Sequence, residues 1–217
     1  MATLSVGVLI SGRGTNLQAL IDGCTDRSLP AEIVLVVSNV RGAAGLSLAT
    51  AAGIPTCVVD HKGFENRPAL EVALTQALEK AGVNFVCLAG FMRLLTPTFV
   101  DRWYDRLINI HPSLLPSFPG LNTHQRAIDA GVRFAGCTVH YVRTEMDSGP
   151  IITQAAVGIR PNDTADTLAA RVLEAEHVCY LSALRLIAEG RTLVDGNVVA
   201  IDSASAPTEA VINPIAN

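Results

Sequence analysis

The chain has few aromatic residues, no excess of basic charge and no long apolar run. Aromatic side chains make up 5% of its 217 residues, and 16 lysines and arginines stand against 20 aspartates and glutamates, for a net charge of −4. A nucleic-acid-binding surface needs clustered positive charge, so this balance argues against a nucleic-acid partner. The apolar stretch at residues 6–10 is too short to cross a bilayer, and no lysine or arginine precedes it as in a signal peptide. We expect no membrane association.

The sequence also lacks the cysteine and histidine patterns of disulfide frameworks and metal sites. Its five cysteines are odd in number and include no Cys-x-x-Cys pair, and its five histidines show no His-Glu-x-x-His spacing. Scattered thiols are typical of proteins in reducing compartments. We therefore expect a cytoplasmic protein without a bound metal.

Hydrophobic residues, in contrast, are abundant and are arranged as alternating strands and helices. They make up 49% of the chain against 17% charged residues, which is typical of a buried parallel sheet. Apolar runs predict strands at residues 4–10, 32–38, 56–59, 83–88 and 107–110, and helical spacing predicts helices at 15–25, 43–52, 66–81 and 97–103. This alternation predicts a single-domain, Rossmann-like α/β fold with a mostly parallel twisted sheet and flanking helices.

The C-terminal part of the chain departs from this alternation. After a short helix at 124–130, the runs at 136–143 and 151–159 predict added strands, partly antiparallel, and residues 164–189 predict the longest helix. Asp195 and Gly196 indicate a hairpin between strands at 192–194 and 198–201. Residues 203–217 are rich in alanine, serine and proline and carry one charge, Glu209. We expect one domain at 1–202, followed by a flexible tail at 203–217.

The most informative motif is the run N-I-H-P-S-L-L-P at residues 109–116, followed by D-S-G-P at residues 147–150. Asn109 and His111 lie at the end of a predicted strand, and the prolines restrain the backbone beside them. An amide donor beside a histidine suits the stabilisation of a developing oxyanion. A carboxylate such as Asp147 behind that histidine would orient the ring and favour its protonated form. A proline-rich turn with a surface histidine would explain one histidine, but not the coincidence of the three groups.

These residues, together with I-S-G-R-G-T-N-L at 10–17, L-A-G-F-M-R at 88–93 and A-E-H at 175–177, resemble the folate-dependent formyltransferase family. The resemblance runs from about residue 4 to about residue 201 and makes 1–202 the expected formyltransferase catalytic domain. It implies transfer of the formyl group of 10-formyltetrahydrofolate to the amine of glycinamide ribonucleotide (GAR) in de novo purine biosynthesis, with release of tetrahydrofolate. It also implies that Asn109, His111 and Asp147 are the catalytic residues.

The glycine loop after the first strand is a candidate phosphate site. Gly12 and Gly14 precede a predicted helix, and backbone N–H groups at a helix N-terminus bind anions. The residues alone leave open a dinucleotide site or a tight turn without a ligand, although Leu17 stands where the third glycine of G-x-G-x-x-G would fall. The resemblance implies that GAR is bound by Gly14, Thr15, Asn16, Leu173, Glu174, Ala175 and Glu176. In this interpretation Glu176 binds the ribose hydroxyls.

Residues 88–95 follow the fourth predicted strand, at the carboxyl edge of the sheet where open α/β folds bind ligands. Gly90 permits close backbone approach, and Phe91, Leu94 and Leu95 could wall a flat ring, although Phe91 and Leu95 could equally be core residues. The resemblance implies folate contacts by Arg67, Met92, Arg93, Leu94, Leu95, Asn109, Arg143, Thr144, Glu145, Met146 and Asp147.

Several alternatives stay open at this point. His140 either points from its strand toward the site or is a structural histidine. A formyltetrahydrofolate deformylase would carry an extra N-terminal domain, and a methionyl-tRNA formyltransferase a C-terminal barrel with a basic surface; we expect neither here. A nucleotide- or folate-binding module without catalysis is disfavoured by the intact Asn109, His111 and Asp147 set. The implied partners are the small molecules GAR and 10-formyltetrahydrofolate, and the chain would act as a monomer or a homodimer.

Overall fold

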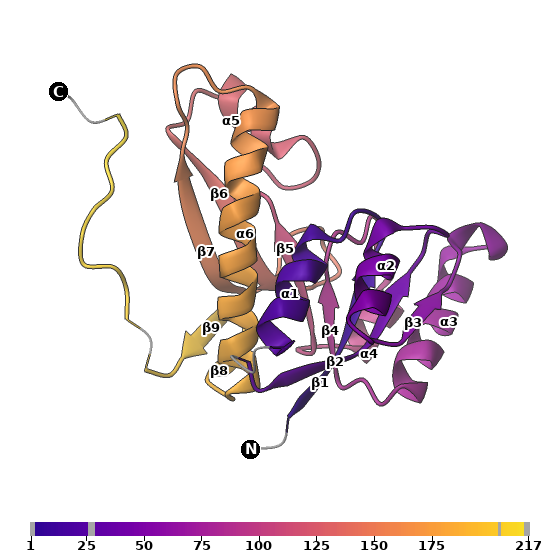
Figure 1. Cartoon of the computed structure of the whole chain (residues 1–217). Helices are drawn as coiled ribbons and strands as arrows, with labels where there is room; N and C mark the ends of the chain where they lie inside the picture. The colour runs from indigo at the N-terminus through magenta and orange to yellow at the C-terminus, as the bar shows by residue number, and fades with distance from the viewer. Residues whose placement is uncertain (1–2, 26–28, 204, 215–217) are drawn as a thin grey trace.

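The computed structural model describes residues 3–25, 29–203 and 205–214, which form a sheet of nine strands flanked by helices (Figure 1). The strands are β1 (Leu4–Ile10), β2 (Ala31–Ser38), β3 (Thr56–Val58), β4 (Phe85–Leu88), β5 (Leu107–His111), β6 (Phe134–Tyr141), β7 (Ile151–Gly158), β8 (Thr192–Asp195) and β9 (Val198–Ile201). The helices are α1 (Thr15–Thr25), α2 (Ala44–Ala51), the 3₁₀ turn η1 (His61–Gly63), α3 (Arg67–Lys80), α4 (Pro97–Arg102), α5 (Thr123–Asp129) and α6 (Ala165–Ala188). Apart from η1, which was not predicted, the element ends lie within two residues of those expected.

The N-terminal part of the sheet is parallel, as predicted, and its strand order is doubly wound. The sheet order begins β3-β2-β1-β4-β5, and each of these neighbouring pairs is parallel. The chain therefore runs outward from β1 to β3 and then returns to β4 on the other side of β1. Ligands of open α/β sheets bind where the order reverses, at the carboxyl ends of the strands. Here that point lies between β1 and β4.

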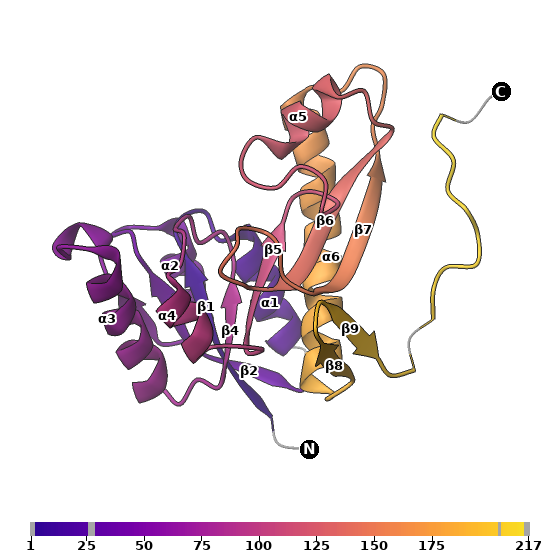
Figure 2. The same cartoon turned by 180° about the vertical axis from the view of Figure 1, so that it is seen from behind.

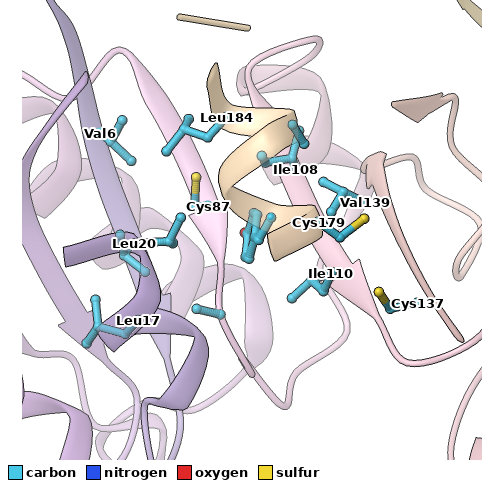
Figure 3. Close-up of a cluster of buried hydrophobic side chains, with 14 of the residues drawn as sticks. Val6, Leu17, Leu20, Cys87, Ile108, Ile110, Cys137, Val139, Cys179 and Leu184 are labelled. Carbon is cyan, nitrogen blue, oxygen red and sulfur yellow. The ribbon is translucent and has the colours of Figure 1, made fainter. Parts of the chain in front are cut away.

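Two hydrophobic cores cover the two faces of the sheet. On one face, Leu20 of α1, Leu184 of α6 and Ile108 of β5 belong to one cluster of buried side chains, which Figure 3 shows. On the other face, which is nearer the viewer in Figure 2, Leu74 of α3 packs with Trp103 at the end of α4. Because both faces are covered, the central strands are apolar on both sides, which explains their continuous hydrophobic runs.

The strands after β5 extend the sheet in a mixed arrangement, which confirms the predicted additions. β6 pairs antiparallel with β5, β7 antiparallel with β6, and β9 parallel with β7 through Ile151 and Val198. The hairpin turn lies one residue later than predicted. Asp195 pairs with Val198, so the two-residue turn is Gly196 and Asn197, and Gly196 takes a positive φ of 59° that glycine adopts without strain.

The expected C-terminal tail is partly described. Residues 205–214 contain no helix or strand and run outside β7 in both views (Figures 1 and 2), whereas residues 204 and 215–217 lie outside the described residues. The Asn213 side chain nevertheless contacts the body of the protein. Its Nδ2 donates to the carbonyl oxygens of Arg133 at 2.6 Å and Ile159 at 3.0 Å. The flexibility of the tail stays a prediction.

Candidate active site

The structure brings the three predicted catalytic side chains together at the carboxyl end of β5. Asn109 and His111 are two residues apart on this strand, so their side chains leave the same face of the sheet. Asp147 lies between β6 and β7 with a left-handed φ of 54°, and its Oδ2 is 3.4 Å from His111 Nδ1. The side chains of His111 and Asp147 are only 7% and 12% exposed, so little solvent screens their interaction.

Both ring nitrogens of His111 face oxygen atoms. Its Nε2 is 3.1 Å from the Phe118 carbonyl oxygen, and its Nδ1 faces the Asp147 carboxylate. The Phe118 carbonyl oxygen can only accept, so Nε2 carries a hydrogen. Asp147 Oδ2 also accepts a hydrogen bond of 2.7 Å from the Gly120 amide, which holds the carboxylate in place. His111 is therefore placed as a hydrogen-bond donor beside a carboxylate.

His140 points toward the site and contacts Asn109, its cross-strand partner in β6. Its Nδ1 is 3.0 Å from the Tyr141 carbonyl oxygen and so carries the hydrogen, which leaves Nε2 as an acceptor 3.5 Å from Asn109 Nδ2. Burial lowers the pKa of His140 and outweighs the opposite effect of the Tyr141 hydrogen bond. The ring is thus neutral near pH 7, so its Nε2 can orient the Asn109 amide and leave the second amide N–H for a ligand.

The predicted GAR residues meet where α1 begins and α6 passes. Gly14 has a φ of +80°, and a Cβ at this position would lie 2.7 Å from the Cα of Gly45 in α2, so a side chain fits here neither conformationally nor sterically. Asn16 Nδ2 donates to Glu176 Oε2 at 2.7 Å, which joins α1 to α6. Thr15 lies between Gly14 and Asn16, at the first position of α1.

Glu176 and Asn16 are both buried, which makes their polar atoms costly to leave unsatisfied. Burial raises the pKa of Glu176, and the hydrogen bond from Asn16 partly opposes that effect. Among the described residues, Asn16 Oδ1 has no hydrogen-bond partner. An orphaned buried acceptor beside a carboxylate fits a ligand with hydroxyl or amine donors. Of the other predicted GAR residues on α6, Leu173 and Ala175 are half-buried and Glu174 is exposed.

The predicted folate residues form a more open and more apolar surface. The irregular segment 91–95 follows β4, whose last residue, Leu88, pairs with Asn109. Met92 is 68% and Leu94 58% exposed, whereas Phe91 is buried in the core beside α3 and α4 and Leu95 packs against that core. Phe91 is therefore a core residue, whereas Leu95 is half-buried at the edge of that core. The apolar side chains of this segment that are available to a flat ring are those of Met92 and Leu94 and the open side of Leu95.

The second predicted folate segment, residues 143–147, contributes a third exposed apolar side chain, Met146. Met146 is 56% exposed and its Cε approaches Gly120, while Thr144 and Glu145 are exposed. Arg143 is turned away from solvent, because its Nη2 donates to Asp105 Oδ1 at 2.6 Å and its guanidinium lies 4.0 Å from the ring centre of Tyr104.

The predicted folate contacts of Arg67 and Arg93 are less fixed. Both side chains are exposed, Arg67 at the first position of α3 and Arg93 in segment 91–95. Neither forms an ion pair with any residue that the structure describes. Their charges are thus available to an acidic ligand.

Two contributors to the site were not predicted. The Phe118 carbonyl contacts His111, and no sequence pattern identifies a backbone carbonyl in an irregular loop. The Ser11 hydroxyl accepts a hydrogen bond of 2.8 Å from the Met92 amide. Its position between β1 and the glycine loop could have identified Ser11 as a candidate.

Two negative observations apply to the described part of the chain. No cluster of three histidine, cysteine, aspartate or glutamate side chains in residues 3–25, 29–203 and 205–214 is arranged to bind a metal. Across these same ranges, the helices are too short or too polar to cross a membrane.

Comparison with known proteins identifies the family. A formyl transferase family model matches residues 4–184. The phosphoribosylglycinamide formyltransferase of Haemophilus influenzae is 42% identical over 208 residues, which cover 96% of this chain and 98% of that protein. The crystal structure of glycinamide ribonucleotide transformylase 1 from Symbiobacterium toebii matches with a TM-score of 0.90 at 45% identity, covering 92% of this chain and 94% of that one.

The chain therefore belongs to the formyl transferase family. The Haemophilus relative, matched along nearly its whole length, places it among the phosphoribosylglycinamide formyltransferases. A further relative is much longer. The trifunctional purine biosynthetic protein adenosine-3 of Bos taurus is 50% identical over 192 residues, which cover 88% of this chain but 19% of that protein, so the chain spans about a fifth of its length.

Proposed function

We propose that this chain transfers the formyl group of 10-formyltetrahydrofolate to the amine of GAR, giving formyl-GAR and tetrahydrofolate. The observation that carries the proposal is the position of the Asn109, His111 and Asp147 cluster. β5, which holds two of these residues, lies beside β4 and its apolar segment 91–95, and β4 lies beside β1, which leads to the glycine loop. Two substrates bound at these neighbouring strand ends would meet next to the cluster.

The chemistry we propose needs no covalent enzyme intermediate, because the substrate amine is the nucleophile. Its nitrogen attacks the formyl carbon, and the formyl oxygen gains negative charge in a tetrahedral intermediate. The bond from that carbon to the folate nitrogen then breaks, while a proton passes from the attacking amine to the leaving nitrogen. We assign this proton transfer to a water held by Asp147.

Asn109 and His111 would stabilise the charged oxygen. The Asn109 amide, oriented by neutral His140, offers one N–H, and His111 offers a positively charged donor. In this structure the His111 Nε2–H is donated to the Phe118 carbonyl. We propose that the formyl oxygen takes over this hydrogen bond, which becomes stronger as negative charge develops in the transition state.

The GAR side would bind the phosphate and the ribose at separate points. The first backbone N–H groups of α1, at Thr15 and Asn16, suit the phosphate, because a helix N-terminus has unpaired donors and a positive dipole end. Glu176 would accept from the ribose hydroxyls, and a hydroxyl donor would also satisfy the orphaned Asn16 Oδ1. Leu173, Glu174 and Ala175 would complete this surface.

The folate side would hold the ring between apolar side chains and use arginines for the acidic part of the cofactor. We propose that Met92, Leu94, Leu95 and Met146 contact the pterin, with Thr144, Glu145 and the backbone of the 143–147 loop around it. Arg67 and Arg93 are exposed cations at this edge of the sheet and would face the folate carboxylates. In this proposal Arg143 supports the loop, because its guanidinium is already paired with Asp105.

A single assay separates the candidate activities. The purified chain is mixed with 10-formyltetrahydrofolate, with and without GAR, and the release of tetrahydrofolate is followed by absorbance. We expect release only when GAR is present, without added metal. Release without GAR would indicate a deformylase, and tight binding of both ligands without turnover would indicate a binding module. We propose further that the enzyme is cytoplasmic, that it acts as a monomer or a homodimer, and that residues 1–202 form its catalytic domain.

A further inference from the structure

The hydroxyl of Ser11 connects the glycine loop with the proposed folate segment. Ser11 directly follows β1, and its own amide donates to the Gly90 carbonyl at 3.1 Å. Its Oγ accepts from the Met92 amide at 2.8 Å and donates to Asn39 Oδ1 at 2.6 Å. One residue therefore holds two points of the irregular segment after β4, at Gly90 and at Met92.

The partner that orients this hydroxyl is itself fixed. Asn39 follows β2 and is buried, and its carbonyl oxygen accepts from His61 Nδ1 at 2.7 Å and from the His61 amide at 3.2 Å. Because the Asn39 side-chain oxygen can only accept, the Ser11 hydrogen must point to it, and the Ser11 lone pairs are left for Met92. Asn39 at the end of β2 thereby orients the Ser11 hydroxyl at the end of β1 as the acceptor for the Met92 amide, which follows β4.

The glycine loop on the other side of Ser11 is equally constrained. The carbonyl oxygen of Gly12 accepts from the Gly45 amide at 3.1 Å, and Gly14 packs against the Gly45 backbone. Ser11 is the residue next to Gly12. The Ser11 hydroxyl therefore links the Met92 amide to the start of the loop that we propose to bind phosphate.

The far end of the folate segment is held by a different residue. Glu71 of α3 is buried and accepts from both the amide and the hydroxyl of Thr96, which caps α4. None of the hydrogen bonds described for Glu71 involves the glycine loop. The segment thus has one end tied to the GAR side, through Ser11, and one end tied elsewhere, through Glu71.

We propose that Ser11 is a positioning residue that couples the two substrate sites. This coupling proposal rests on the proposed function, because it takes the loop at 12–16 as the GAR site and Met92 as part of the folate site. When either ligand orders its own segment, the Ser11 hydrogen bonds hold the other segment in its binding geometry. The second ligand then binds a segment that is already ordered, so each ligand increases the affinity for the other by the same factor.

The test measures that factor directly. Dissociation constants for GAR and for tetrahydrofolate are measured by calorimetry, each alone and with the other ligand saturating, in the wild type, Ser11→Ala, Ser11→Thr and Glu71→Ala. In the wild type we expect each ligand to tighten the other by about 3- to 10-fold, as for the net effect of a typical hydrogen bond. In Ser11→Ala the factor should fall to about 1, and the KM of both substrates should rise by about 2- to 10-fold.

The two other variants are matched controls. Ser11→Thr keeps the hydroxyl and should restore most of the coupling. Glu71→Ala loosens the far end of the same segment, so it should weaken tetrahydrofolate binding alone and leave GAR binding within about twofold. If Ser11→Ala does not fold, Ser11→Cys removes most of the hydrogen-bonding strength at nearly the same volume and replaces it in the series.

Four results would overturn the proposal. The first is that the two ligands show no coupling in the wild type, and the second is that their coupling is unchanged in Ser11→Ala. The third is that Ser11→Ala affects the binding of one ligand only. The fourth is that Ser11→Ala lowers the melting temperature and leaves both dissociation constants unchanged. The last result would assign Ser11 a purely structural role. Formyl transfer by the wild type tests the proposed function by itself, whereas the coupling factor compares binding between variants, so either can fail without the other.

Discussion

On the α1–α6 side of the candidate site, polar side chains are buried and paired, whereas on the side formed by residues 91–95 and 143–147, apolar side chains are exposed. Asn16 and Glu176 contact each other across two helices, and both are buried. Met92, Leu94 and Met146 sit on irregular backbone and face solvent. We therefore expect the first side to be organised before a ligand binds and the second to gain apolar contacts only when a ligand covers it.

This difference predicts how mutations act on each side. Changes on the α1–α6 side should alter folding stability together with ligand affinity, because the same buried groups serve both. Changes on the exposed side should alter folate affinity with little effect on stability, since exposed side chains contribute little to the free energy of unfolding. Changes in the proposed catalytic cluster at the carboxyl end of β5 should affect turnover more than either affinity.

The largest effect is expected for Asp147→Asn. This substitution removes the negative charge 3.4 Å from His111 Nδ1, so the ring loses its charged partner. We expect kcat to fall on the order of 100-fold or more, as for loss of an oxyanion donor, with small changes in the two dissociation constants. His111→Ala should be at least as damaging, and the double variant little worse, because the two residues act as a unit. Single-turnover kinetics of all three variants test this, and additive losses would contradict it.

Gly14→Val should come next and should affect the GAR side alone. The positive φ and the 2.7 Å approach to Gly45 make any side chain at this position strained, and a valine would also obstruct the phosphate. We expect the KM for GAR to rise about 30-fold or more and the melting temperature to fall, with tetrahydrofolate affinity within a few-fold.

Gly12→Ala is the matched control for this variant, because a Cβ at Gly12 meets no atom within 4 Å. It should leave the melting temperature unchanged. Equal loss of both ligands in Gly14→Val, measured by calorimetry, would mean that the loop assignment is wrong or that the fold is damaged.

Glu176→Gln should separate binding from stability. Loss of the charged acceptor should raise the KM for GAR on the order of 10-fold. Because burial raises the pKa of Glu176, ionising it costs stability in the folded chain. This cost is absent below the ordinary carboxyl pKa of about 4.3 and grows as pH rises through the raised value. The variant should therefore become more stable relative to the wild type between pH 4 and 7. Thermal melts at several pH values measure this, and a pH-independent difference would refute it.

The fold was predictable because its signals are strong and local. The apolar runs of β1, β2 and β4 are buried on both faces, and the long helix α6 carries an apolar stripe, so their ends agree closely with prediction. The hairpin turn lies one residue later than predicted, because it is fixed by the pairing of Asp195 with Val198 and not by local residue preference.

The site was predictable only where spacing along one element decides it. A separation of two residues on a strand places Asn109 and His111 on the same face, whatever surrounds them. The partners of Arg143 are decided by tertiary structure, since Asp105 lies 38 residues earlier in the sequence. The same holds for Ser11 and Met92, which are 81 residues apart. No local pattern in one sequence carries such contacts.

Met92→Ala tests the exposed side. The side chain is 68% exposed, so its truncation should change the melting temperature by less than a degree or two. If the side chain covers a bound ring, its loss removes apolar burial, and the KM for 10-formyltetrahydrofolate should rise about 3- to 10-fold. The KM for GAR should not change. Steady-state kinetics and thermal melts measure both quantities, and a clear loss of stability without a change in folate KM would reverse the comparison between the two sides.

The smallest effect is expected for deletion of residues 203–217, which belong to neither side of the site. In residues 205–214 the hydrogen bonds to the body are those of Asn213 to the Arg133 and Ile159 carbonyls, which lie beyond the last pair of β5 with β6, His111 with Thr138. The deletion also removes the Ser203 carbonyl, which accepts from Arg191 Nη2 at 3.2 Å. Deletion after Asp202 would expose these two carbonyls to water, which can replace the lost donors at little cost. We therefore expect kcat and both KM values to stay within a few-fold of the wild type. The full-length Asn213→Ala variant is the matched control and should reproduce any small decrease in melting temperature. A large loss of activity in the truncated chain, with no loss in Asn213→Ala, would show that the tail acts through other contacts and that the catalytic domain extends beyond residue 202.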